Sequence, residues 1–157
     1  MDAPLDRIDL RLLAELQQDA RLTVAELAER VSLSPSPCWR RVKRLEQAGY
    51  IEGYHARLSA PRLGYGITAF VSVVMGNHSQ EVARAFEAAI QDIPEVVACH
   101  NVSGEYDFLL EVVATDLATY GQFARNVLQA LPGVRELHSS FSLMSIKARR
   151  RLPLPGA

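Results

Sequence analysis

The chain has 157 residues, 48% of them hydrophobic and 22% charged, the composition of an ordinary globular protein with room for one medium or two small domains. Its apolar runs fall short of the roughly 18 residues that span a membrane, and the N-terminus lacks a secretory signal pattern, so we predict a cytoplasmic protein with no membrane partner. The net charge of −1 hides an uneven division, with nine basic and nine acidic side chains in residues 1–60 and four basic ones in residues 147–157, so any anion-binding surface must come from local clustering.

The first 50 residues carry three helical patterns separated by short turns. Apolar residues recur at helical spacing from about residue 6 to residue 18, which predicts the first helix. The second helix begins after Thr23, whose spacing from Glu26 is that of a capping box. Its predicted buried stripe is Val24, Leu27, Ala28 and Val31. The third helix begins near Ser34 or Ser36, either of which can cap it, and ends at Gly49.

The pattern changes after the third helix. Residues 51–58 look like a strand or a wing, and residues 60–66, which include a proline and two glycines, look like a linker. Gly104-Glu105 predicts a tight type II′ hairpin turn further along the chain. The elements expected beyond the linker are a strand over 67–75, a helix through 82–93, strands over 96–103 and 106–114, a helix through 117–131 and a strand over 134–146.

The order βαββαβ is the ferredoxin-like arrangement, an antiparallel sheet with both helices on one face. The predicted fold class is therefore α+β, with an N-terminal winged helix-turn-helix over residues 1–60 and a ferredoxin-like domain over residues 61–157 that ends in the basic tail. The first strand of that domain is apolar on both faces, with Val71 on one and Phe70 on the other. Because an uncovered sheet face would leave a large apolar patch in water, we predict at least a homodimer.

The third helix carries the clearest functional pattern, four basic residues within five positions. Cys38, Val42 and Leu45 set its inner face, and a helix-turn-helix presents the outer face of this helix to the major groove of double-stranded DNA. The side chains predicted to contact DNA are Ser34, Ser36, Trp39, Arg40, Arg41, Lys43 and Arg44. The first four are expected near base edges and the last three on phosphates. The alternatives are a solvated basic face and an indole that packs against the wing or the second domain.

Six short segments resemble the Lrp/AsnC family of feast/famine transcriptional regulators, and together they extend the match over about residues 5–150. They are LDRID at 5–9, SPSPC at 34–38, RVKRLE at 41–46, GYI at 49–51, SGEYDFLL at 103–110 and LPGV at 131–134. The resemblance implies control of transcription in response to an amino acid, dimers that pair through their sheets, and assembly into octamers or similar rings.

In that family the effector lies in a pocket between dimers, beside the loop that joins the second and third strands. The residues that the resemblance assigns to the effector are Ser103, Gly104, Tyr106, Asp107 and, on the last strand, Ser140 and Ser142. The carboxylate suits the ammonium group of an amino acid, and backbone N–H groups at the glycine turn suit its carboxylate. The two serines on the last strand replace the bulkier apolar residues of the leucine-responsive member, which argues against leucine. The alternative is an ordinary hairpin with a surface aspartate.

Two other functions compete with this one. The siroheme decarboxylases resemble the same two-domain architecture, and an enzyme of that kind would handle a porphyrin and leave DNA alone; the intact basic third helix argues against it. An interaction protein that forms mixed oligomers with another regulator is the other candidate.

Cys38 is best explained as a small buried hydrophobe, since no neighbouring base is evident that would activate its thiol, and the four histidines show no metal-ligand spacing. We therefore predict no catalytic residues, no metal and no cofactor.

Overall fold

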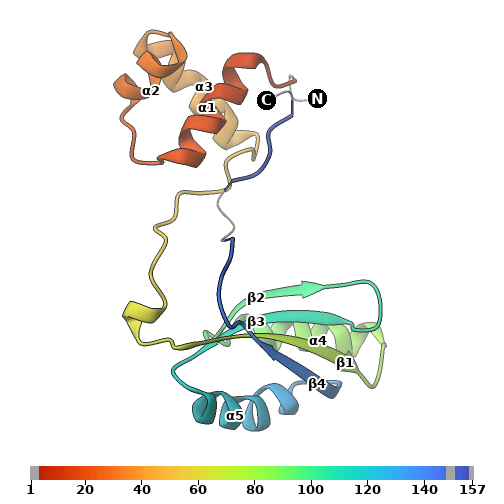
Figure 1. Cartoon of the computed structure of the whole chain (residues 1–157). Coiled ribbons are helices and arrows are strands. Elements are labelled where there is room, and N and C mark those ends of the chain that lie inside the picture. Colours follow the sequence, from red (N-terminus) through yellow and green to blue (C-terminus); the bar gives the residue numbers. More distant parts are fainter. Residues whose placement is uncertain (1–3, 148–150, 156–157) are drawn as a thin grey trace. The chain divides into compact units, whose positions relative to one another are not determined.

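The computed structural model describes residues 4–147 and 151–155 of the chain (Figure 1). The described residues fall into two compact units. The first comprises those before Leu58 together with those after Ile146, and the second is Leu58–Ile146. No helix in the described part of the chain is long and apolar enough to cross a membrane.

The first unit is built from three helices, at the positions that the sequence predicts. They are α1 (Arg7–Gln18), α2 (Val24–Val31) and α3 (Pro35–Gln47). Asp6 caps α1 and forms a capping box with Asp9, and the predicted capping box of Thr23 and Glu26 begins α2. Ser34 occupies the N-cap position of α3, but its hydroxyl makes no capping hydrogen bond there. The proline that follows it fills the first helical position, where a missing N–H costs little.

The three helices enclose an apolar core. Its buried members are Leu12, Leu13, Leu27, Ala28, Val31, Cys38 and Leu45. Full burial of a large aliphatic side chain stabilises a fold by roughly 1.5–3 kcal/mol, so this core is the main force that holds α3 against α1 and α2. Val24, which the predicted stripe places inside, is instead 38% exposed, because it is the first residue of α2 and lies at the edge of the core.

Residues 51–58 adopt no regular secondary structure, so the strand that the sequence predicts there is absent. A strand needs a neighbour for its backbone N–H and C=O groups, and no described segment of this chain pairs with residues 51–58. Alternation in the sequence therefore identified a segment suited to a strand without showing whether a partner is available.

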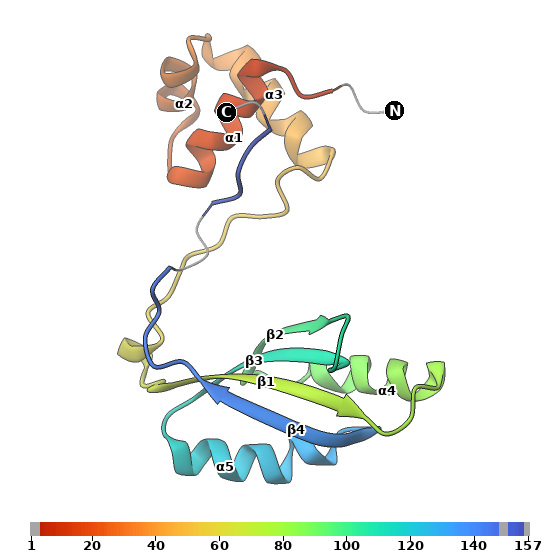
Figure 2. The same cartoon turned by 45° about the vertical axis from the view of Figure 1, so that its right-hand side comes forward.

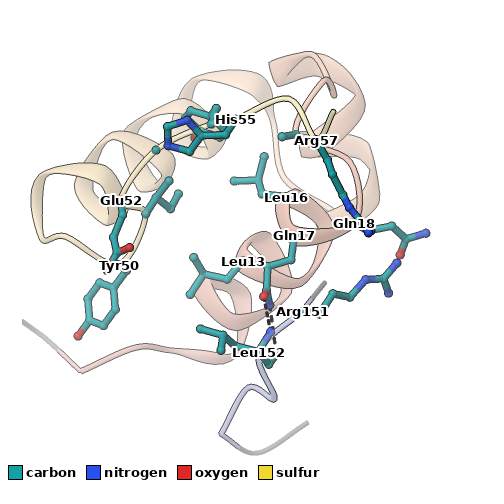
Figure 3. A pocket seen from close by; sticks show the side chains of 14 residues that line it. Leu13, Leu16, Gln17, Gln18, Tyr50, Glu52, His55, Arg57, Arg151 and Leu152 are labelled. Atoms are coloured by element: carbon teal, nitrogen blue, oxygen red, sulfur yellow. Dashed lines mark hydrogen bonds between the residues drawn. The ribbon is translucent and has the colours of Figure 1, made fainter. Parts of the chain in front are cut away.

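The described end of the C-terminal tail packs on the first unit. Gln17 Oε1 accepts a hydrogen bond from the backbone N–H of Leu152 at 2.7 Å, and Gln17 Nε2 donates to the Leu152 carbonyl at 3.3 Å. Leu154 is half-buried against the helical core. A cavity of about 830 Å³ is lined by the C-terminal half of α1, residues 50–57 and this tail (Figure 3). The tail thus contacts the first unit, although the sequence joins it to the last strand of the second.

The second unit is a four-stranded antiparallel sheet whose buried face is covered by two helices (Figure 2). Its elements are β1 (Ile67–Met75), α4 (Gln80–Gln91), β2 (Val96–Asn101), β3 (Phe108–Ala114), α5 (Leu117–Asn126) and β4 (Val134–Phe141). The strand order β2-β3-β1-β4 and the element order βαββαβ confirm the predicted ferredoxin-like arrangement.

The sheet has one buried face and one open face, as the predicted element order implies. On the helix side, Val71 is 0% exposed and belongs to the same core cluster as Phe86 of α4. On the other side, Phe70 is 41% exposed and lies between Glu111 of β3 and Ser140 of β4 in the strand register. The open face therefore leaves apolar surface in contact with solvent.

The connection between β2 and β3 is longer than predicted. Asn101 of β2 pairs with Phe108 of β3, so residues 102–107 form the loop, and the expected two-residue turn at 104–105 is wrong. A type II′ turn needs a first central residue with φ near about +60°, whereas the φ of Gly104 is +123°. The glycine still gives the loop its positive φ, as its place in the sequence suggests.

The last strand is shorter than predicted. β4 ends at Phe141 and not at residue 146: Phe141 pairs with Ala69 of β1, and one further hydrogen bond joins the N–H of Ser142 to the Thr68 carbonyl at 2.9 Å. Beyond this point Leu143 is 99% exposed. An apolar run in the sequence does not make a strand where its backbone is not paired with a neighbouring strand.

Candidate functional site

The N-terminal end of α3 carries a group of exposed side chains, which we call its outward edge. Ser34, Ser36, Trp39 and Arg40 are all exposed there, and Trp39 keeps 50% of its surface in solvent. Cys38, between them, points into the core, and burial raises the pKa of its thiol, which does not favour a reactive thiolate. The edge thus presents two hydroxyls, an indole and a guanidinium, side-chain types that can contact base edges in a major groove.

Two of the four basic side chains of α3 are held by carboxylates at the start of α1. Asp9 is 0% exposed, and its Oδ1 accepts a hydrogen bond from Arg41 Nη1 at 2.9 Å. Its Oδ2 accepts hydrogen bonds from the backbone N–H of Asp6, at 3.0 Å, and from Arg44. Asp6 Oδ2 accepts a second hydrogen bond from Arg41, at 2.6 Å. Arg41 and Arg44 therefore belong to a four-membered ion network between α1 and α3.

The network favours the charged forms of Asp6 and Arg41. The pKa of Asp6 is lowered to about 2, first by the backbone N–H of Asp9 and then by Arg41. The pKa of Arg41 is raised, because its guanidinium faces two carboxylates. Arg41 thus holds a full positive charge that the two aspartates offset within the protein.

A second ion pair engages Lys43. Its ammonium group lies 2.7 Å from Glu46 Oε2, and the Tyr54 hydroxyl donates a hydrogen bond to Glu46 Oε1 at 3.0 Å. Burial, and then Glu46, raise the pKa of Tyr54 to about 12, so the phenol stays protonated and remains a donor. Within the described residues, Arg40 is consequently the only cation of residues 40–44 with no carboxylate at salt-bridge distance.

The sequence held a signal for this compensation. Asp6 and Asp9 are three residues apart, and Arg41 and Arg44 are also three apart. Side chains with that spacing share one face of a helix, so two matched pairs can meet where helices pack. The sequence alone does not show which face of α3 meets α1, and it therefore suggested DNA contacts for all four cations.

The predicted effector loop places Asp107 against β1. Its Oδ2 accepts a hydrogen bond from the backbone N–H of Met75 at 2.7 Å, and its Oδ1 lies 3.0 Å from His78 Nε2. The Asp107 side chain is 25% exposed, so a ligand can reach its carboxylate from solvent. Sequence reasoning missed His78, because no local pattern links it to a residue 29 positions further along. A cationic ligand at Asp107 would compete with His78 for the same oxygen.

The rest of the predicted effector loop lies toward β4. Ser103 and Gly104 are exposed in residues 102–107. The ring of Tyr106 lies 5.4 Å from that of His138, measured between centroids. The loop therefore has one side near β1, through its aspartate, and one side near β4, through its tyrosine.

The two serines lie at the end of β4. Ser140 is opposite Phe70 in the register, on the open face of the sheet, and Ser142 follows the last residue of the strand. Within the described part of one chain, no hydrogen bond joins Asp107 to either serine. The structure thus brings the loop residues together and leaves the serines as a separate group on the open face.

Two family models match the chain. Residues 68–152 match the Lrp/AsnC ligand binding domain, and residues 5–52 match a winged helix-turn-helix DNA-binding domain. The first match alone covers more than half of the chain, and the second includes the whole of α3.

Similar proteins match over nearly the full length. The Bkd operon transcriptional regulator of Pseudomonas aeruginosa is 43% identical, over 97% of this chain and 99% of its own. The DNA-binding transcriptional activator DecR of Escherichia coli is 40% identical, over 96% and 99%. The crystal structure of a Neisseria meningitidis transcriptional regulator in complex with L-Met superposes with a TM-score of 0.92 at 40% identity, and covers 97% of this chain and 98% of that one.

Proposed function

Because this chain belongs to the Lrp/AsnC family of transcriptional regulators, we propose that it binds specific sequences of double-stranded DNA and that an amino acid changes this binding. We assign DNA binding to residues 1–60, and effector binding and oligomerisation to residues 61–157, the basic tail of which packs on the first unit where it is described. No residue has a catalytic role. The observation that carries the proposal is the exposed N-terminal edge of α3, which lies opposite an inner face where Cys38 and Leu45 are buried.

The DNA contact is made by this edge. Ser36, Trp39 and Arg40 project from it, while Cys38 and Leu45 are buried on the opposite side of the helix. A helix presented in this way can enter a major groove with its N-terminal residues nearest the bases. The exposed indole leaves apolar surface in water, and the neighbouring guanidinium can bind an anionic group. Both side chains are therefore suited to an interface.

The effector contact is made by the loop at Asp107 and completed by a second subunit. The solved relative in complex with L-Met supports an amino acid as the ligand class. The carboxylate of Asp107 suits the ligand's ammonium group, and N–H groups of the loop around Gly104 suit its carboxylate. Because Ser140 and Ser142 stand apart from Asp107 within one chain, they contact an effector held mainly by another copy.

Oligomerisation follows from the open sheet face. Phe70 is 41% exposed on that face, and a second copy that covers it would remove apolar surface from water. A dimer also suits a DNA site with two half-sites, and further pairing gives an octamer or a similar ring. The partners are therefore DNA, an amino acid and copies of the chain itself, in the cytoplasm.

The proposal is tested with the purified full-length chain and two fluorescent duplexes, one from the region upstream of its own gene and one with the same bases in scrambled order. We expect the upstream duplex to bind at least about 1,000-fold more tightly at physiological salt. Equal binding of both duplexes would contradict sequence-specific regulation. Soret absorbance on mixing with a porphyrin, together with no DNA binding, would favour the siroheme decarboxylase instead.

A further inference from the structure

Asp9 is the one charged side chain that is buried among the described residues. A buried carboxylate is costly unless its oxygens are paired, and Asp9 receives hydrogen bonds from Arg41, from Arg44 and from the backbone N–H of Asp6. The two arginines are 32 and 35 residues away in the sequence. One carboxylate of α1 therefore fixes two successive turns of α3.

The network also fixes the direction of these arginines. Consecutive residues of a helix point about 100° apart, so Arg40 and Arg41 face different surroundings. Arg41 turns toward Asp6 and Asp9, whereas Arg40 shares the outward edge with Ser36, four residues before it. Turning Arg41 toward a DNA phosphate would remove a partner from a carboxylate that has no access to water. The protein therefore loses an internal ion pair for each phosphate that Arg41 would gain.

We infer that Asp9 is a positioning residue for DNA binding: it offsets the charges of Arg41 and Arg44, fixes the rotation of α3 against α1, and leaves Arg40 as the uncompensated cation that meets DNA. This inference rests on the proposed DNA-binding function and refines it. Arg41 and Arg44, which the sequence assigns to phosphates, instead hold the exposed N-terminal edge of α3 in place. Specificity then depends on the orientation of α3, and the electrostatic part of affinity depends mainly on Arg40.

The first test compares the salt dependence of DNA binding for Arg40→Gln and Arg41→Gln, with the wild-type full-length chain and the same two duplexes. Each phosphate contact contributes roughly 0.9 to the slope of log affinity against log salt concentration, and a symmetric dimer loses two contacts per substitution. We expect Arg40→Gln to reduce the slope by about 1.8. We expect Arg41→Gln to leave the slope unchanged while it lowers the thermal midpoint and narrows the affinity gap between the two duplexes.

A conservative pair keeps the test decisive if Arg41→Gln unfolds. Lysine preserves the charge of arginine, but its ammonium group ends one bond short of the Nη1 atom through which Arg41 contacts both Asp6 and Asp9. Arg40→Lys should therefore retain the wild-type salt slope. Arg41→Lys should retain it as well, yet still lose discrimination between the upstream and scrambled duplexes, because the shorter side chain does not reach both aspartates as Nη1 of Arg41 does.

The second test removes the buried charge itself. Asp9→Asn removes the carboxylate partner of Arg44 and one of the two carboxylate partners of Arg41, so we expect a steeper salt slope and tighter binding to the scrambled duplex. Asp19→Asn is the matched control, since Asp19 is an exposed carboxylate just after the other end of α1. The control should behave as wild type in both measurements.

The outcomes separate the inference from the function it rests on. A slope that falls equally in Arg41→Gln and Arg40→Gln would overturn the positioning role, as would a folded Asp9→Asn with wild-type slope and discrimination. A wild-type chain that binds neither duplex would instead remove the proposed DNA-binding function.

Discussion

Replacement of Asp107 by asparagine separates the two uses of its carboxylate. Oδ2 accepts a hydrogen bond from the Met75 N–H at 2.7 Å, which is a structural contact, and Oδ1 faces His78 and solvent, where the effector is proposed to bind. Asparagine keeps an acceptor oxygen for Met75 but carries no charge for an ammonium group. Alanine removes both, and so provides the comparison.

The structure sets the size of each effect. Asp107→Ala leaves the partly buried Met75 N–H without a partner, which should cost about 1–3 kcal/mol of stability. Asp107→Asn should stay within about 1 kcal/mol of wild type, because a neutral hydrogen bond replaces a charged one. A charged hydrogen bond to the ligand contributes about 1.5–3 kcal/mol, so both variants should lose roughly 10- to 150-fold in amino-acid affinity.

The assay is calorimetric titration with the amino acid that raises the wild-type thermal midpoint most among the twenty, alongside urea unfolding of each variant. Glu105→Gln is the control, since it removes an exposed carboxylate from the same loop without touching Asp107. Equal ligand affinities for wild type and Asp107→Asn would refute the reasoning. The carboxylate would then be only an anchor for β1.

Three further predictions concern stability. Gly133 has a φ of +75°, and a Cβ there would overlap Val82 and Met75, so Gly133→Ala should cost about 1–3 kcal/mol; an unchanged thermal midpoint would contradict this. The pKa of Asp6 is lowered to about 2 on folding, so its stabilising effect is present above about pH 4 and is lost as the pH falls toward 2. The stability gap between wild type and Asp6→Asn should shrink over that range, and a constant gap in urea titrations would argue against the ion network. Leu154→Ala should cost about 1 kcal/mol, because the half-buried leucine joins the tail to the helical core; no loss would mean that the tail is not held there.

The elements of the chain were predictable where local chemistry decides them. The capping box of Thr23 begins its helix as expected, and the alternation around Val71 gives the correct faces of β1. These features depend on residues within one turn or one strand. Such signals survive in the sequence because neighbours along the chain are also neighbours in space.

What escaped prediction depends on contacts between distant segments. Residues 51–58 look like a strand or a wing in the sequence but pair with no strand in the described part of the chain, and the pairing of β4 with β1 ends at Phe141 although the apolar run continues. The same holds at the candidate sites. Arg41 forms an ion pair with Asp9, and Asp107 lies within hydrogen-bond distance of His78. Each pair joins residues about 30 positions apart. Charge clustering alone could not distinguish these engaged side chains from Arg40, which has no carboxylate partner among the residues that the structure describes.

The central claim is that one chain couples the binding of an amino acid to the binding of DNA, and fluorescence anisotropy with the upstream duplex tests it most directly. Titrations at fixed salt are run with and without a saturating amount of the amino acid that stabilises the protein most. We predict that the ligand changes the affinity for the upstream duplex by about 5- to 150-fold, and that DNA changes the affinity for the ligand by the same factor. Identical DNA affinities with and without each of the twenty amino acids would contradict the claim.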